Sequence, residues 1–196
     1  MGVHIADSAI ILAGGKSIRM GYNKVLLTVE GRRIVDVLAA ELGEIFSQIV
    51  FVSNSADVAP PAGVDVVADQ LADIGPLGGI HAGLGVCRSQ YAFVTACDMP
   101  NLNLSYISFM REMLLRHEIQ ASVLATQFGK HIEPLSAFYN RRLRDLIEQY
   151  CHTGGRGLNG FLRGQDVALI DEATARRFSP DGSMFANLNT EDEYRT

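Results

Sequence analysis

A stretch near the amino terminus combines an apolar run, paired glycines and clustered cations. Residues 9–13 are all apolar, which predicts a short buried strand. Glycines at 14–15 let the backbone turn sharply and approach a ligand, because they carry no Cβ. Backbone N–H groups in such a loop converge on an anion, and lysine and arginine add full positive charge. The stretch therefore predicts a loop that holds a polyphosphate, with the cations Lys16, Arg19 and Lys24.

Two better-known phosphate loops do not fit this stretch. The first glycine of a P-loop would fall at position 10, which is Ile10. The spacing G-x-G-x-x-G cannot be placed on Gly14, Gly15 and Gly21. The alternative interpretation is a plain strand-to-helix turn with solvated cations.

A carboxylate follows a second predicted strand. Residues 91–97 are mostly apolar and end in Asp98-Met99-Pro100. Ligands of α/β proteins bind at the carboxyl ends of parallel strands, and Mg²⁺ prefers one or two carboxylates together with phosphate oxygens. Asp98 is thus a candidate magnesium ligand. The alternative is that Asp98 caps a helix that begins near Leu102.

A second glycine-rich turn, at 75–79, follows Asp69 and Asp73. A helix that begins after this turn can direct its amino terminus at an anion or a polar base edge. Asp69 is a candidate ligand-binding residue, with Asp73 as a competitor and a turn-forming aspartate as the alternative. A third glycine-rich turn surrounds Arg156, which could hold an acceptor phosphate or lie in a mobile loop.

The elements that must position these residues alternate between strand and helix. Apolar runs and helical spacing predict strands at 9–13, 25–29, 49–52, 64–67, 91–97, 121–126 and 167–170, and helices at 34–46, 80–87, 104–117, 141–150 and 158–162. Thr190 and Glu193 form a capping box for a final helix. This order predicts an α/β fold of three layers, α/β/α, with a mostly parallel central sheet. At 196 residues the chain suits one domain, spanning 1–196.

Composition excludes several classes of protein. The net charge of −5 argues against a nucleic-acid-coating protein. We find no window that could span a membrane and no secretory signal, so we expect a cytoplasmic protein without a membrane partner. The spacing of the cysteines suits neither zinc nor a disulfide framework, and we expect reduced thiols at Cys87, Cys97 and Cys151.

The chain resembles the molybdenum cofactor guanylyltransferases, a group of nucleotidyltransferases with a Rossmann-like fold. The resemblance rests on Leu-Ala-Gly-Gly at 12–15 with Arg-Met-Gly at 19–21, on Gly-Pro-Leu-Gly-Gly at 75–79, on Glu-Pro-Leu at 133–135 and on Asn-Leu-Asn-Thr at 187–190. Relatives that use CTP usually carry Ala-Ala-Gly at the position of residues 13–15. One departure is Asn23, where the family often has aspartate.

The resemblance implies a role for each candidate residue. The catalytic residues would be Arg19, Lys24 and Asp98. The nucleotide would contact Leu12, Ala13, Gly14, Gly15, Lys24, Asp69, Gly78 and Asp98, with Asp69 on the guanosine. The metal, Mg²⁺, would bind Asp98 and Asn189, and the alternative for Asn189 is that it positions water or substrate. The acceptor would contact Glu133, for which a structural carboxylate is the alternative, and Asn187, together with Arg156 of the third glycine-rich turn. The amino-terminal half would then bind nucleotide and the carboxyl-terminal half would bind acceptor.

The implied reaction transfers GMP from GTP to the molybdenum–molybdopterin cofactor and releases pyrophosphate. Transient contacts with proteins that donate and accept the cofactor are implied as well. Three alternatives stay open: a cytidylyltransferase for the same cofactor, a nucleotidyltransferase for another small phosphate acceptor, and a non-catalytic nucleotide-binding or cofactor-carrier protein.

Overall fold

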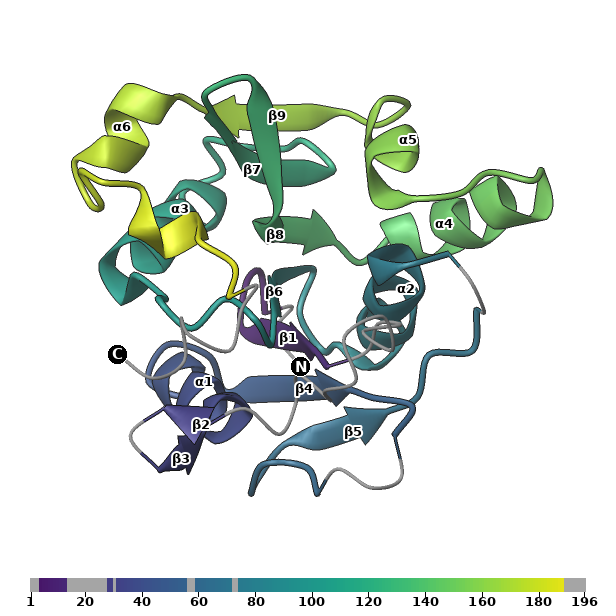
Figure 1. Cartoon of the computed structure of the whole chain (residues 1–196). Coiled ribbons are helices and arrows are strands. Elements are labelled where there is room, and N and C mark those ends of the chain that lie inside the picture. Colours follow the sequence, from purple (N-terminus) through teal and green to yellow (C-terminus); the bar gives the residue numbers. More distant parts are fainter. Residues whose placement is uncertain (1–3, 14–27, 30, 56–58, 72–73, 189–196) are drawn as a thin grey trace.

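The computed structural model describes residues 4–13, 28–29, 31–55, 59–71 and 74–188. A seven-stranded sheet crosses the middle of the molecule (Figure 1). All its strands run in one direction except β8, which is antiparallel to both of its neighbours. In spatial order the strands are β5 (Asp65–Val67), β4 (Gln48–Val52), β1 (Ser8–Leu12), β6 (Tyr91–Ala96), β8 (His131–Asn140), β7 (Val123–Phe128) and β9 (Val167–Ile170).

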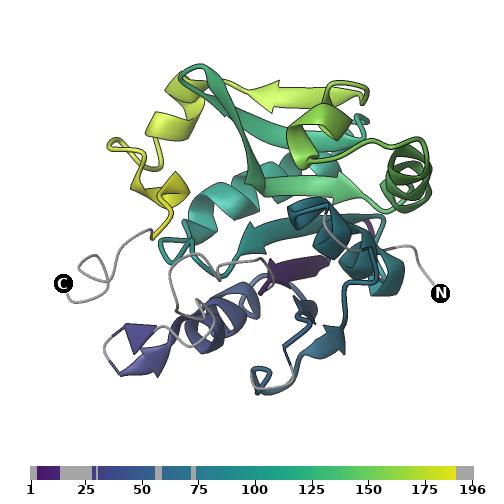
Figure 2. The same ribbon diagram turned by 45° about the vertical axis from the view of Figure 1, so that its right-hand side comes forward.

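Helices cover both faces of the sheet, which confirms the predicted three-layer α/β fold (Figures 1 and 2). One face carries α1 (Ile34–Leu42), α3 (Leu104–Leu115), α6 (Glu172–Arg176) and the 3₁₀ turn η3 (Ser183–Phe185). The other face carries α2 (Pro76–Val86), α4 (Leu143–His152) and α5 (Leu158–Leu162). A separate two-stranded ribbon is formed by β2 (Thr28–Val29) and β3 (Arg32–Arg33).

Each face of the sheet has its own apolar core. Beneath α1 and α3, the rings of Phe46, Phe93 and Phe138 are buried, and the last two have centroids 5.3 Å apart. Beneath α2 and α4, the core contains Ile10, Val94 and their neighbours. Continuous burial of β1, β4 and β6 explains their mostly apolar sequences, since a strand covered on both faces needs no polar alternation. Within the described ranges, no helix is long and apolar enough to cross a membrane.

Helix α2 begins at Pro76, four residues before the predicted start at Ile80. Proline suits the first turn of a helix, where its missing N–H has no partner to lose, and Gly75 precedes it with φ +66°. The prediction failed because glycines are poor helix formers, costing about 1 kcal/mol each. Here they allow close packing: a Cβ at Gly83 would lie 2.8 Å from Ile10 Cδ1 on β1.

Other boundaries also differ from the predictions. Helix α1 ends at Leu42 rather than at residue 46, because Gly43 closes it and a turn follows. The Glu-Pro-Leu segment, for which no strand was predicted, lies inside a ten-residue strand, β8. The short α6 and η3 were not predicted at all. The capping box at 190–193 lies outside the described residues.

Candidate functional site

Among the described candidate residues, Ala13, Asp69, Asp98 and Glu133 lie at one edge of the sheet. The parallel strands β1, β4, β5 and β6 all end there, and the antiparallel β8 begins there. The chain passes from β1 outward to β4 and β5 and then returns to place β6 on the other side of β1. Such a reversal of strand order leaves a crevice between the diverging loops, which is where open α/β sheets bind ligands.

The end of β1 is fixed by its neighbours on both sides. The N–H of Ala13 donates to Val52 O at 2.9 Å, and the N–H of Cys97 donates to Leu12 O at 3.0 Å. Leu12 also packs against α2, since a Cβ at Gly79 would lie 2.9 Å from its Cδ2. The loop that leaves β1 therefore starts from a rigid point. Gly14, Gly15, Arg19 and Lys24 lie outside the described residues.

Asn54 holds Asp69 in place through two hydrogen bonds. The N–H of Asp69 donates to Asn54 Oδ1 at 2.7 Å, and Asn54 Nδ2 donates to Asp69 O at 3.0 Å. This clamp joins the loops that follow β4 and β5. Sequence analysis did not single out Asn54, although the polar run Ser-Asn-Ser directly after a predicted strand was an available signal.

The Asp69 carboxylate lies against the first turn of α2. Its Oδ1 accepts from Leu71 N at 2.8 Å, so Asp69 does form the turn considered as an alternative. A Cβ at Gly78 would lie 2.7 Å from Asp69 Cγ, so only glycine leaves room for the carboxylate there. Partial burial raises the pKa of Asp69, while the hydrogen bond from Leu71 opposes that shift. The competitor, Asp73, lies outside the described residues.

Asp98 follows β6 and is half-buried at the same edge. The alternative that it caps the next helix is wrong, because Asn103 caps α3 through its Oδ1, which accepts from Tyr106 N at 2.9 Å. The carboxyl-terminal segment reaches this point: the N–H of Leu188 donates to Asp98 O at 2.8 Å. This bond places the exposed Asn187 beside the loop of Asp98. Asn189, the other predicted metal ligand, lies outside the described residues.

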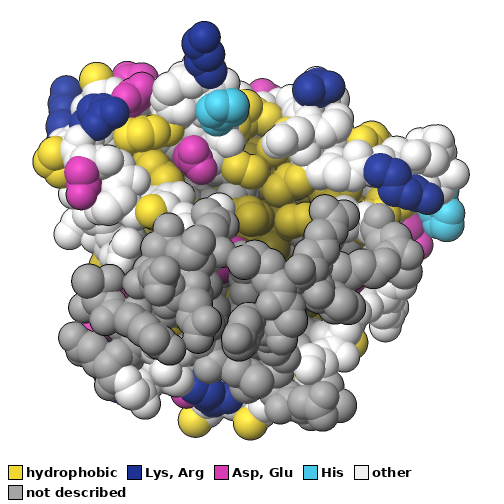
Figure 3. Space-filling model, in the orientation of Figure 1, with side chains coloured by type: hydrophobic (Ala, Val, Ile, Leu, Met, Phe, Trp, Pro, Cys, Tyr) yellow, Lys and Arg dark blue, Asp and Glu magenta, His cyan; other side chains and the backbone are white. Residues whose placement is uncertain are grey.

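Glu133 lies where β8 extends past the end of β6. Thr95 of β6 pairs with Ser136, and the register of β8 against β7 shifts before Glu133 pairs with Thr126. Half-buried apolar side chains from Ile132 and Leu135 flank it. Figure 3 shows apolar side chains gathered in a hollow over this part of the sheet, between α5 and α2. Burial raises the pKa of Glu133.

Arg156 lies between α4 and α5, on the face of the sheet that carries α2. Its Nη1 donates to Gly155 O at 2.8 Å and its own carbonyl accepts from Tyr150 OH at 3.0 Å, so the turn is held by specific bonds. The charges of Arg156 and Asp69 shift the pKa of Cys151 in opposite directions. Asn187 follows η3, which packs into the core on the other face of the sheet, so these two predicted acceptor residues come from elements on opposite faces.

Comparisons with known proteins agree with this geometry. The profile of the MobA-like NTP transferase domain matches residues 9–172. The chain belongs to this family. It is 43% identical to the molybdenum cofactor guanylyltransferase of Syntrophotalea carbinolica over 95% of this chain and 88% of the relative. It is 39% identical to the probable molybdenum cofactor guanylyltransferase of Peptoclostridium acidaminophilum over 99% of this chain and 89% of that protein.

A solved structure shares the fold of this MobA-like chain. The crystal structure of molybdopterin-guanine dinucleotide biosynthesis protein A from Archaeoglobus fulgidus superposes with a TM-score of 0.79 and 22% identity. The match covers 95% of this chain and 94% of the other. The resemblance inferred from the loop at 12–21 is thereby confirmed at the level of the family and the fold.

MobA-like transferases generally use a divalent metal ion. The residues present suit a metal ion that takes only one or two ligands from the protein. Among the described residues, no group of three or more histidine, cysteine, aspartate or glutamate side chains could enclose a metal. Mg²⁺ does not need such a cage, because it binds through one or two carboxylates and completes its shell with phosphate oxygens and water. The half-buried Asp98 at the strand edge offers a hard oxygen donor of this kind.

The raised pKa of Glu133 predicts a pH-dependent cost to stability. The folded state holds the Glu133 proton more tightly than the unfolded state, so stability falls as pH rises from the ordinary glutamate pKa, about 4.3, through the raised value. We expect Glu133→Gln to remove this cost and raise Tm at pH 7 by on the order of 2 °C. The gain should vanish near pH 4, as thermal unfolding across the pH range would show.

The control for this experiment is Glu118→Gln, which replaces an exposed glutamate after α3. Its Tm should follow that of the parent at every pH. A stability gain in Glu133→Gln that is the same at pH 4 and pH 7 would show that packing, not charge, is responsible.

Proposed function

We propose that this protein transfers the GMP unit of GTP to the terminal phosphate of the molybdenum–molybdopterin cofactor and releases pyrophosphate. The observation that carries the proposal is the meeting of Ala13, Asp69 and Asp98 at the strand-order reversal. Relatives of 39–43% identity over nearly the whole chain are named molybdenum cofactor guanylyltransferases, which supports this choice of nucleotide and acceptor.

Asp69 is proposed to bind the guanine base. An ionised carboxylate only accepts hydrogen bonds, and the Watson–Crick edge of guanine presents adjacent N–H donors. Cytosine presents one amino group beside an acceptor nitrogen, which a carboxylate does not match. The Asn54 clamp and the missing Cβ of Gly78 hold the carboxylate at the first turn of α2, so it is positioned before the base arrives.

The loop that follows β1 is proposed to wrap the triphosphate. Backbone N–H groups of Gly14 and Gly15 would face the phosphates, while Arg19 and Lys24 would neutralise charge as pyrophosphate leaves. Asp98, with Asn189 from the carboxyl-terminal segment, would hold Mg²⁺ against the phosphate oxygens. Magnesium bound there would act as a Lewis acid and as a template.

The acceptor is proposed to lie over β8, in contact with Glu133 and Asn187. Ile132 and Leu135 would provide an apolar surface for the flat ring system of the acceptor. Arg156 would reach the acceptor phosphate from the α2 face; its Nη1 is engaged with backbone carbonyls, so binding would have to use its other guanidinium nitrogens.

The chemical difficulty of the reaction lies in bringing two anions together. The acceptor phosphate is already a nucleophile at neutral pH and needs no strong general base. Positioning and charge neutralisation therefore provide most of the rate enhancement. This suits a site in which rigid strand ends position the binding groups and cations surround the phosphates.

We place the reaction in a reducing, cytoplasmic compartment and treat residues 1–196 as one unit. Cys87 is a buried free thiol in the structure, which supports a reducing compartment. Proteins that donate the cofactor or accept the product would meet this enzyme transiently.

The deciding experiment measures pyrophosphate release with GTP or CTP in the presence of Mg²⁺ and molybdenum–molybdopterin. We expect release with GTP and at least about a hundredfold lower kcat/KM with CTP, since a buried site that loses matched hydrogen bonds discriminates strongly. Release with CTP alone would make the protein a cytidylyltransferase. No release with either nucleotide, in a preparation that still binds GTP, would support a carrier function instead.

A further inference from the structure

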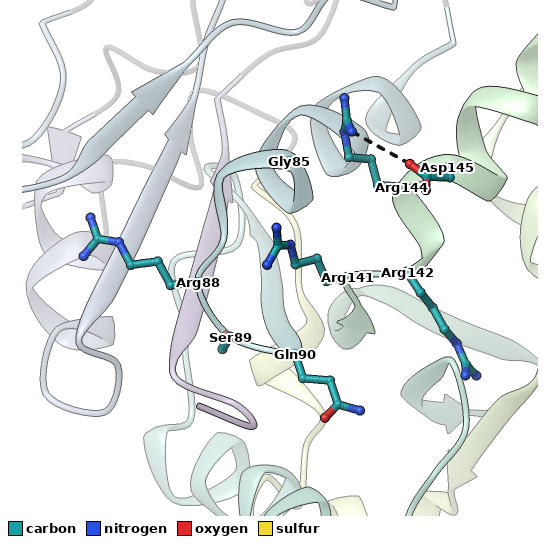
Figure 4. Close-up of a pocket in the computed structure, with 8 residues that line it drawn as sticks. All are labelled: Gly85, Arg88, Ser89, Gln90, Arg141, Arg142, Arg144 and Asp145. Carbon is teal, nitrogen blue, oxygen red and sulfur yellow. Dashed lines mark ion pairs between the residues drawn. The ribbon is translucent and has the colours of Figure 1, made fainter. Parts of the chain in front are cut away.

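A second charged site lies at the opposite edge of the sheet from Asp98. A pocket of about 420 Å³ opens where β6 begins and β8 ends, next to the last turn of α2. Small-molecule sites are typically ~300–1,000 Å³, so the volume suits a compact ligand. The residues that line the pocket are Gly85, Arg88, Ser89, Gln90, Arg141, Arg142, Arg144 and Asp145 (Figure 4).

The lining is strongly basic on a protein that is acidic overall. Four arginines and one aspartate line the pocket, a local charge of +3, whereas the whole chain carries −5, and the side chain of Arg142 points away from the other arginines (Figure 4). Figure 4 shows Arg141 in the middle of the group, with Arg144 near Gly85 and Arg88 on the other side. Clustered positive charges repel one another. An anion that neutralises several of them therefore binds more strongly than an anion that contacts a single arginine.

The internal partners of these arginines leave much of the charge uncompensated. Arg88 forms an exposed ion pair with Asp65 at 3.3 Å, and Arg144 lies 3.8 Å from Asp145, which is a long contact. Within the described part of the chain, the guanidinium of Arg141 makes no ion pair. Exposed pairs of this kind contribute ~0–1 kcal/mol, so a multivalent anion would displace them at little cost.

The floor of the pocket is rigid. The N–H of Arg141 donates to Gln90 O at 2.7 Å, which ties the end of β8 to the start of β6. The buried Ser89 hydroxyl is bonded to Ser8 Oγ at 2.7 Å and Tyr91 O at 2.6 Å. Arg142 is held by Ser122 Oγ at 2.8 Å. The arginines therefore project from fixed backbone positions, which reduces the entropy lost on binding.

We propose that this pocket is a binding site for a small ligand that carries phosphoryl groups, separate from the nucleotide edge. Guanidinium groups bind phosphoryl oxygens in a bidentate manner, and Arg141 and Arg144 provide two such groups beside the small Gly85. A carboxylate ligand would offer fewer acceptor oxygens per group and would bind more weakly.

The test is a titration with inorganic pyrophosphate, followed by two-dimensional NMR of the amides at fixed ionic strength without Mg²⁺. The amides of Ser89 and Gln90 report on the pocket, while those of Asp69 and Gly78 report separately on the nucleotide edge. We expect the amide signals of Ser89 and Gln90 to show saturable chemical-shift changes with pyrophosphate. The same signals should report a weaker affinity for citrate. Citrate binding as tight as pyrophosphate would overturn the phosphoryl assignment.

A matched pair of double variants completes the test. Arg141→Gln/Arg144→Gln should raise the pocket Kd at least about tenfold while shifts at the nucleotide edge persist. Arg116→Gln/Arg163→Gln, which removes two exposed arginines elsewhere, should leave the pocket Kd unchanged. The proposal is contradicted if pyrophosphate up to about 10 mM causes no saturable chemical-shift change at Ser89 and Gln90. It is also contradicted if the two double variants lose the same amount of pyrophosphate affinity at the pocket. Because neither readout uses catalysis, the result is independent of the proposed transferase reaction.

Discussion

Asp98→Asn is expected to lower turnover with GTP by on the order of 10³-fold. Lewis-acid stabilisation by a metal contributes several kcal/mol to the transition state, and each 1.36 kcal/mol is a factor of ten. The amide is a weaker magnesium ligand than the carboxylate but has nearly the same shape. The main-chain carbonyl of residue 98 would still accept the bond from Leu188, so the carboxyl-terminal segment stays docked. Steady-state kinetics across a Mg²⁺ titration would measure the loss.

Asp166→Asn is the matched control for this change. Asp166 precedes β9, so it lies at the other edge of the sheet, and its side chain is exposed. The hydrogen bonds that Asp166 makes to β7 and the residue before it involve its main-chain carbonyl, which accepts from the N–H groups of Ser122 and Val123. The control should keep full turnover and an unchanged Mg²⁺ optimum. If Asp98→Asn only weakens GTP binding and leaves kcat intact, Asp98 is not the metal ligand.

Gly78→Ala is expected to raise KM for GTP by about 10- to 100-fold with little change in kcat. A Cβ would lie 2.7 Å from Asp69 Cγ, closer than packed atoms approach, so the carboxylate must leave its position. Loss of a charged hydrogen bond to the base costs ~1.5–3 kcal/mol of binding free energy. That cost corresponds to the expected 10- to 100-fold increase in KM. Helix propensity acts in the opposite direction, since alanine favours the helix over glycine by about 1 kcal/mol.

A double-mutant cycle isolates the cause of this effect. If Gly78→Ala acts by displacing Asp69, it should change KM little in an Asp69→Ala background. Gly164→Ala serves as the control, because a Cβ there would meet only Phe161 O at an ordinary 3.6 Å. If Gly78→Ala raises KM equally with and without Asp69, the glycine is needed for phosphate binding or for folding, and not to leave room for the base-binding carboxylate.

The sequence by itself determined many of the elements and supplied the residues proposed for the candidate site. Mostly apolar runs identified β1, β4 and β6, because strands buried on both faces favour apolar residues on both sides. Asp98 could be proposed because it directly follows a predicted strand, which is a local property of the chain, whereas Asp69 was proposed from the family resemblance. The glycines at 14–15 and the Gly-Pro pair at 75–76 were visible in the sequence as well.

Only the tertiary structure decided how these pieces meet. The sheet order, the antiparallel direction of β8 and its shifted register depend on pairing between residues far apart in the chain, which periodicity does not encode. The resemblance placed Gly78 among the nucleotide contacts, but only the structure shows that the Asp69 carboxylate occupies the place where a side chain of residue 78 would lie. The basic pocket joins Arg88 to Arg141 across more than fifty residues, because β6 and β8 are neighbours in space and bring their ends together.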